Sequence, residues 1–242
     1  MDTSVRCVMP ELLDGMDAQD PRAMRARRDL QRVHRAMRTV SVLTRAVAGL
    51  RLARTPRRIL ELGGGDGTLM LRFARAHTDW SPVELTLIDM QDMLSARTRE
   101  AYRSLGWDVH VMSKDALHWA SGTVAARHDL CVANLFLHHF NESDLTRLLS
   151  AVARDCDAMV ACEPRRGFFA LLGSRLVGLL GASHVTRSDA VTSVVAGFRG
   201  GELSALWPTS APGWSMREYA AFPFTHCFAA ARTGAPSPRD AP

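Results

Sequence analysis

The stretch "ILELGGGDGTLML", residues 59–71, places four glycines and an aspartate between two apolar runs. Because glycine has no side chain, a glycine-rich turn lets a ligand approach the backbone closely. Two carboxylates accompany the turn, from Glu61 just before the first glycine and from Asp66 within it. A second anion held beside Asp66 would be repelled by about 1–4 kcal/mol, which disfavours a phosphate. The turn therefore favours a ligand with a cationic group, unless Asp66 only caps the helix that follows.

Three further polar residues come where apolar runs end. Asp89 lies some twenty residues beyond the glycines, where a carboxylate can accept hydrogen bonds from both hydroxyls of a ribose. Asp115, in "SKDALHW", can accept a hydrogen bond from the adenine amino group, and Asn134 closes the run "CVAN". Open parallel sheets bind ligands at the carboxyl ends of their strands. A phosphate-free nucleoside with cationic groups, S-adenosylmethionine, is the ligand that this pattern predicts.

Adjacent histidines, His138 and His139, follow the same run and are the candidate catalytic residues. Methyl transfer from a sulfonium is an in-line displacement that mainly needs alignment, and a base is needed only for a protonated acceptor. Histidine suits that task for a phenol. Because successive side chains diverge on a helix or strand, we expect one histidine in the site and the other in a structural hydrogen bond. The same divergence argues against chelation by the pair, and no metal is predicted.

Arginines at the next strand end are candidates for binding the acceptor. Arg165 and Arg166 can receive a carboxylate or phenolate, or else they are solvated or paired with Glu163 and nearby acids. His184 is predicted to contact the acceptor from a lid. His34, in the first helix, either closes over the cofactor or is a satisfied helix histidine.

The elements that must position these residues follow an alternating pattern. Short apolar runs separated by helix-like stretches are typical of a parallel sheet with crossover helices. Asn141 is expected to cap a helix, with Asp144 three residues later. Two final strands joined through Pro223 predict an antiparallel hairpin at the sheet edge. The expected strands are 58–62, 84–88, 108–112, 129–133, 158–162, 214–220 and 225–231, with helices at 68–77, 91–105 and 168–180.

The N-terminal residues 1–56 are predicted to form a helical cap. Asp20 followed by Pro21 predicts a helix over 21–38, and Ser41 is expected to cap a second one that ends before Pro56. Residues 57–232 are expected to form the main domain, with 165–210 as an insertion or lid and 233–242 as a loose tail. About a dozen arginines between residues 22 and 58 belong either to solvated helix faces or to a surface for nucleic acid or membrane.

Four segments in order, "LELGGGDGTL", "LIDMQDM", "SKDALHW" and "VANLFLHHF", resemble the class I S-adenosylmethionine-dependent methyltransferases over about residues 57–163. The resemblance implies a Rossmann-like α/β fold with seven strands in the order 3-2-1-4-5-7-6, strand seven antiparallel and helices on both faces. It also implies a set of cofactor-binding residues: Glu61, Gly63, Gly64, Gly65, Gly67, Asp89, Met90, Asp115, Ala116 and Asn134.

The flanking segments, among them "CEPRRGFFALLGSRLVGLLG", are similar to those of small bacterial methyltransferases often found beside type III polyketide synthases. That similarity implies methylation of a phenolic or quinone-like secondary metabolite, with O-methylation favoured and C- or N-methylation open. An RNA or protein methyltransferase and a non-catalytic cofactor-binding subunit are the alternatives. Strand four lacks the Asn-Pro-Pro-Tyr type of sequence found in enzymes that methylate exocyclic amines, so a nucleic-acid substrate is not favoured.

The composition agrees with one soluble domain. The chain has 242 residues, 47% of them apolar, and a net charge of +5. The five cysteines form no C-x-x-C pair, and Cys131 and Cys162 are expected in the core. The chain shows no secretory signal pattern and no apolar run of about 20 residues, so a cytoplasmic protein without a membrane span is expected. Nothing in the sequence indicates the oligomeric state.

Overall fold

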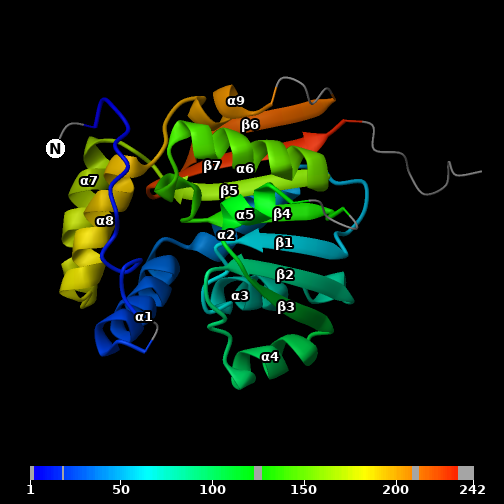
Figure 1. The fold of residues 1–242 in the computed structure, drawn as a ribbon, viewed down its shortest axis with the longest axis horizontal. Helices are drawn as coiled ribbons and strands as arrows, with labels where there is room; N and C mark the ends of the chain where they lie inside the picture. The colour runs from blue at the N-terminus through cyan, green and yellow to red at the C-terminus, as the bar shows by residue number, and fades with distance from the viewer. Residues whose placement is uncertain (1–2, 18, 123–126, 209–212, 234–242) are drawn as a thin grey trace, which may run out of the picture.

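A computed structural model describes residues 3–17, 19–122, 127–208 and 213–233. A seven-stranded sheet forms its centre, with helices on both faces and a group of helices beyond one end of the strands (Figure 1). The strands are β1 (Arg58–Leu62), β2 (Val83–Asp89), β3 (Trp107–Ser113), β4 (Leu130–Asn134), β5 (Ala158–Pro164), β6 (Trp214–Ala221) and β7 (Thr225–Arg232). The helices are α1 (Pro21–Ala36), α2 (Thr39–Gly49), α3 (Thr68–Ala76), α4 (Ala96–Arg103), α5 (Ala116–Ala120), α6 (Glu142–Asp155), α7 (Phe168–Arg175), α8 (His184–Ala196) and α9 (Glu202–Leu206), with short 3-10 turns η1 (Thr78–Trp80), η2 (Leu137–His139) and η3 (Leu176–Leu180).

The strand order is β3-β2-β1-β4-β5-β7-β6, as the resemblance implies. The first five strands are parallel, and β7 runs antiparallel to both β5 and β6. The expected hairpin of the last two strands therefore exists, with β6 at the edge. The order places β1 and β4 side by side at the centre, where the strand order reverses and open α/β sheets bind their ligands.

The central strands β1, β4 and β5 are buried on both faces, which explains their nearly continuous apolar runs. Successive side chains alternate between two core clusters, so Leu60 and Leu62 pack with α5 and α6, whereas Ile59 packs with α2 and α3. Cys131 and Cys162 are fully buried in opposite clusters, which confirms their expected place in the core.

Helix boundaries follow local capping chemistry. Asn141 caps α6 as expected, because its side-chain oxygen accepts a hydrogen bond from the Asp144 backbone N–H at 3.0 Å. The expected helix at 91–105 begins later, since Ser95 is the residue that caps α4. The expectation that Ser41 caps the second helix is wrong: α2 already begins at Thr39, after Arg38 in a left-handed conformation (φ 54°).

The segment expected as an insertion or lid, 165–210, forms α7, η3, α8 and α9 as far as Pro208, and residues 209–210 lie outside the described residues. Helices α1, α7 and α8 lie together at the left of the sheet in Figure 1, beyond the carboxyl end of β5. The chain before α1 passes along α8, where the Cys7 N–H donates to the Val195 carbonyl. The expected tail, 233–242, lies outside the described residues except for Thr233. Within the described parts, no helix has the length and apolarity to cross a bilayer.

Candidate functional site

The glycine loop joins β1 to α3 by a tightly bonded turn. The N–H groups of Gly63 and Gly64 both donate to the Ile88 carbonyl, and the Gly67 N–H donates to the Gly64 carbonyl. Gly63, Gly65 and Gly67 have positive φ angles of 72°, 54° and 68°. Glycine adopts this region without the steric cost that other residues meet. A Cβ at Gly65 would meet no atom within 4 Å, so the backbone there faces open space in which a ligand can lie.

Strand register places Asp89 beside this loop. Leu62 pairs with Ile88, so the residues that follow, Gly63 and Asp89, are neighbours at the carboxyl ends of β1 and β2. One oxygen of the Asp89 carboxylate accepts a hydrogen bond from the Gly65 N–H at 2.9 Å, and the other accepts from Gln91 N–H at 3.2 Å. The glycine loop and the end of β2, more than twenty residues apart in the sequence, are thus joined by hydrogen bonds.

Glu61 lies beneath the loop and is buried. Its Oε2 has no hydrogen-bond partner among the described residues. Burial raises its pKa well above the usual value, and the nearby charges of Asp66 and Asp89 raise it further. A buried carboxylate surrounded by two others is stabilised by any cation that reaches it. These three carboxyl groups therefore fit a ligand with a positive group at the loop.

Asp66 has two structural partners. One oxygen accepts hydrogen bonds from the N–H and hydroxyl of Thr68, which caps the start of α3. The other accepts from the side-chain amide of Gln31 at 2.6 Å, so α1 is fixed against the glycine loop. His34, one turn further along α1 than Gln31, is partly buried, and its Nε2 has no partner among the described residues. Burial and the nearby Arg72 lower its pKa to about 4, so this imidazole is neutral at pH 7.

The other predicted cofactor residues lie along the same edge of the sheet. Met90 is largely exposed directly after Asp89. Asp115 follows β3 and caps α5, since its Oδ1 accepts from the N–H groups of Leu117 and His118 at 2.7 and 3.1 Å. Asn134 ends β4. Ala116 and Asn134 are both buried, and β4 lies directly beside β1. The structure thus brings this set together around the carboxyl ends of β1 to β4.

Glu163 organises the turn after β4. Its carboxylate is fully buried and accepts hydrogen bonds from the N–H groups of Phe136 and Leu137 at 3.1 and 2.9 Å. It also accepts from Nδ1 of His138 at 2.8 Å. The ring of Phe136 packs against Gly63, where a Cβ would come within 2.3 Å of it. Through these bonds Glu163, on β5, holds the turn η2 against the glycine loop.

His138 is buried between two carboxylates. Its Nδ1 faces Glu163, and its Nε2 lies 3.3 Å from Oε1 of Glu11. Burial lowers its pKa, but the hydrogen bonds and charges of Glu11 and Glu163 outweigh that effect and raise it to about 9. The imidazole therefore carries a proton at neutral pH and cannot accept another. Of the two predicted catalytic histidines, this one is in the structural hydrogen bond.

His139 is partly exposed, and its Nδ1 lies 3.1 Å from Oδ2 of Asp14. The expectation that the two histidines diverge is wrong, because in the 3-10 turn η2 their ring centroids lie only 4.3 Å apart. Glu11, His138 and His139 even place a potential metal-ligand atom each within 4.8 Å of the others. A metal bound there would have to displace the proton that Glu11 and Glu163 stabilise on His138.

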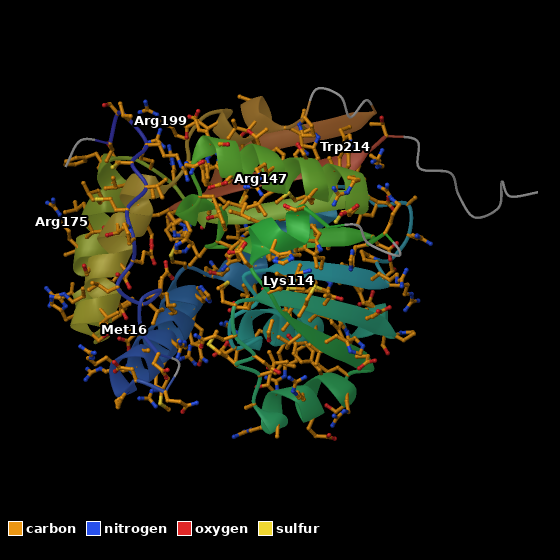
Figure 2. All side chains as sticks on the ribbon, viewed as in Figure 1. Met16, Lys114, Arg147, Arg175, Arg199 and Trp214 are labelled. Carbon is orange, nitrogen blue, oxygen red and sulfur yellow. The ribbon has the colours of Figure 1, made fainter. Side chains whose placement is uncertain are left out.

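The N-terminal segment 3–17, which the sequence patterns did not connect to the site, closes one side of it. Arg6 donates to the carbonyls of His138, Phe140 and Ala196 at 3.1, 2.8 and 2.8 Å. Arg199, labelled beside this segment in Figure 2, donates to the Ser4 carbonyl. Glu11 also accepts a hydrogen bond from the Ser193 hydroxyl of α8. These contacts join residues more than 120 positions apart, for which local sequence gives no signal.

The three predicted acceptor-binding residues lie in different surroundings. Arg166 is buried and bonded to Glu202 and to the Gly197 carbonyl, so it is not available to an acceptor. His184 is exposed at the first turn of α8, nine residues or about 13 Å along the helix from Ser193, which contacts the site. Arg165 is exposed at the end of β5 and stays a candidate.

Comparisons with known proteins give one family and several similar folds. Residues 59–157 match the family described as a methyltransferase domain. A search of curated proteins finds no match. The structure is similar to the plantazolicin methyltransferase BpumL in complex with SAH, with a TM-score of 0.64 and 14% identity over 88% of this chain and 91% of that one.

Two other solved structures are similar over a shorter share of their own length. An O-methyltransferase family protein from Burkholderia thailandensis has 16% identity and a TM-score of 0.56, over 90% of this chain and 62% of that chain. The pyocyanin biosynthetic protein PhzM has 21% identity and a TM-score of 0.55, over 89% and 60%. At such identities the likeness shows the fold, and this chain spans about three fifths of these two proteins.

Proposed function

We propose that this protein, whose residues 59–157 match the family described as a methyltransferase domain, transfers the methyl group of S-adenosylmethionine to a small aromatic acceptor, by O-methylation. The observation that carries the proposal is the buried Oε2 of Glu61, which has no hydrogen-bond partner in the part of the chain that the structure describes and lies beneath a glycine loop bonded to Asp89. A cationic amino-acid head satisfies that oxygen, whereas a pyrophosphate would add negative charge next to three carboxylates.

The chain's residues divide the binding of the cofactor among three strand ends. The backbone at Gly65 leaves room for the amino-acid part, and an ammonium group next to Glu61 would stabilise the charged form of this buried carboxyl group, which burial and its acidic neighbours disfavour. Asp89 would accept hydrogen bonds from the ribose hydroxyls, and Asp115 would accept one from the adenine amino group. The bound cofactor supplies a methyl group on a sulfonium, so the chain's main task is to align the acceptor.

His139 is the proposed general base for a phenolic acceptor. Its Nδ1 lies 3.1 Å from Oδ2 of Asp14. In the tautomer with Nδ1–H directed at that carboxylate, Nε2 would have a lone pair to accept a proton from the acceptor hydroxyl. The neighbouring His138 cannot serve, because both of its ring nitrogens face carboxylates and it is already protonated. Asp14 would orient the base in the way that a carboxylate orients histidine in hydrolytic triads.

The surroundings of His139 support an aromatic acceptor. The ring centroid of Phe136 lies 6.4 Å from that of His139, and Phe140 packs edge-on against Phe136 at 5.1 Å. Aromatic side chains bind flat apolar rings by stacked or edge-to-face contacts. The resemblance to methyltransferases found beside polyketide synthases favours a phenolic or quinone-like secondary metabolite.

Calorimetry tests the cofactor site. S-adenosylmethionine should bind the wild-type protein, and NADH should not compete. Gly65→Arg fills the open space with a bulky side chain, and Glu61→Gln removes the charge, so both should weaken binding at least about tenfold with the fold retained. Unchanged affinity in both variants would refute the site.

Transfer of a labelled methyl group to a panel of phenols tests the base. His139→Ala should lower kcat by about 10²–10⁴-fold at near-normal cofactor affinity. His184→Ala, an exposed histidine away from the site, is the matched control and should keep full rate. If His139→Ala also keeps full rate, the base assignment is wrong. Cofactor binding without transfer to any acceptor would instead favour a non-catalytic subunit.

A further inference from the structure

An apolar face is exposed on α7 and η3. Large side chains at positions 168, 172, 176 and 179–180 recur at helical spacing and lie on one side. Phe168, Phe169 and Leu179 are 71%, 74% and 83% exposed. Contiguous apolar patches on a protein surface commonly mark an interaction site. The face consists of Phe168, Phe169, Leu172, Leu176, Leu179 and Leu180.

The charged residues in the segment that carries this face are all positive. Between Pro164 and Ser188 the sequence contains four arginines and neither aspartate nor glutamate. Three of these arginines, Arg165, Arg175 and Arg187, are exposed. Figure 2 places Arg175 at the outer margin of the helices, on the side away from the sheet. The apolar face is therefore bordered by positive charge.

A basic hollow on α1 adjoins the same face. It has a volume of about 460 Å³ and is lined by Arg25, Arg28, Asp29, Gln31, Arg32 and Arg35. The Arg32 guanidinium donates to the Gly181 carbonyl, directly after Leu180, at 3.3 Å. The one carboxylate of the lining, Asp29, is 1% exposed and bonded to Arg32, Ser183 and Thr186. The hollow thus offers several guanidinium groups next to the apolar side chains.

The exposed apolar face and the neighbouring arginines together favour one kind of partner over others. Two copies of the chain joined symmetrically through the face would bring arginines against arginines. A nucleic acid would satisfy the arginines but leave the exposed phenylalanines and leucines without apolar contact. An anionic lipid surface meets both needs, since leucine and phenylalanine enter the acyl boundary while arginines bind the head groups.

We propose that α7, η3 and the basic hollow of α1 form a docking surface for an anionic lipid bilayer. Because α7 begins four residues after β5 ends, the surface lies at the same end of the sheet as the glycine loop. Docking would therefore bring lipid close to the site without requiring a spanning helix, and it does not depend on which acceptor is methylated.

Co-sedimentation of the full chain with vesicles tests the proposal. We expect binding to vesicles of phosphatidylcholine with phosphatidylglycerol, and at least about tenfold weaker binding to phosphatidylcholine alone. The double variant Leu176→Glu with Leu179→Glu, and separately Arg28→Glu with Arg35→Glu, should each lower binding about tenfold or more. Both pairs lie on the surface, and circular dichroism checks that the fold is retained.

Met216→Glu is the matched control, because it places the same charge at an exposed apolar position on β6. It should bind vesicles like the wild-type protein. Equal binding to both vesicle types, or full binding by the leucine variant, would overturn the proposal. A dimer in analytical ultracentrifugation that the leucine variant abolishes would assign the face to a second copy instead.

Discussion

At the scale of single residues, the charge state of each site group follows from what surrounds it. Glu61 is buried among carboxylates and its pKa rises, whereas His138 is buried between carboxylates and its pKa rises for the opposite reason, the attraction of its proton. The raised pKa favours the neutral form of Glu61, and a cation from outside the chain would stabilise its charged form. His138 is instead held in its charged form by two carboxylates of the chain itself, and so serves the structure.

The pH dependence of stability tests the state of His138. Its folded-state pKa of about 9 exceeds the ordinary 6.5, so its stabilising effect is complete below pH 6.5 and is lost as the pH rises through 9. The shift corresponds to about 3 kcal/mol. The free energy of unfolding of the wild-type protein, minus that of His138→Gln, should therefore shrink by about this amount between pH 6.5 and pH 10.

Urea unfolding at several pH values measures this difference. His118→Gln is the matched control, because His118 is an exposed histidine on α5. A difference for His138→Gln that stays constant over the whole range would contradict a protonated imidazole between Glu11 and Glu163.

Local sequence predicts residues that lie at strand ends and misses those brought in from elsewhere. Asp89 meets the glycine loop because two adjacent parallel strands end together, and that juxtaposition follows from the alternating pattern alone. Glu11 and Asp14 reach the histidines through a segment without regular structure, so no period indicates them. The sequence leaves open whether Arg166 binds an acceptor or pairs with an acid, because its partner, Glu202, comes from a different helix.

At the scale of elements, strands are predicted most accurately and the helices beyond the sheet least. A buried parallel strand has a distinct apolar run, and β1 matches its expected limits at 58–62. The predicted start of α2 is wrong because Arg38 adopts a left-handed conformation. Nothing about an arginine side chain indicates that conformation in the sequence. The packing of α1 against α8 depends on one carboxylate, Asp29, which no repeat in the sequence indicates.

Replacement of Asp29 tests the contact between α1 and α8. Asp29 is buried and accepts hydrogen bonds from the Ser183 N–H at 2.6 Å and the Thr186 hydroxyl at 3.1 Å, and it pairs with Arg32. Asp29→Ala should lower the free energy of unfolding by about 3 kcal/mol, because it leaves these donors without a partner. Hydrogen exchange should rise at the first turn of α8.

Asp20→Ala removes the N-terminal cap of α1, the helix that carries Asp29, and is the matched control. It should cost about 1 kcal/mol and leave exchange in α8 unchanged. Equal effects of the two variants would mean that Asp29 acts only within α1.

At the scale of the whole molecule, the net charge of +5 gives a test between acceptor classes. A neutral phenol makes no counterion-releasing contacts, so its KM should change less than about twofold between 50 and 200 mM salt, in the absence of lipid. A nucleic-acid acceptor making several phosphate contacts would lose affinity by about 10³-fold or more over that range. Steady-state kinetics at both salt concentrations decide between them.

The sheet order also determines when the molecule can be completed during its synthesis. β7 leaves the ribosome last among the strands, yet it lies between β5 and β6 and forms hydrogen bonds with both. Until it arrives, β5 is an unpaired edge, of the kind that joins other chains and starts aggregation. A nascent chain that stalls before Thr225 therefore exposes the edge of β5 to pairing with other chains. Chaperones that cover such edges should raise the yield of folded protein.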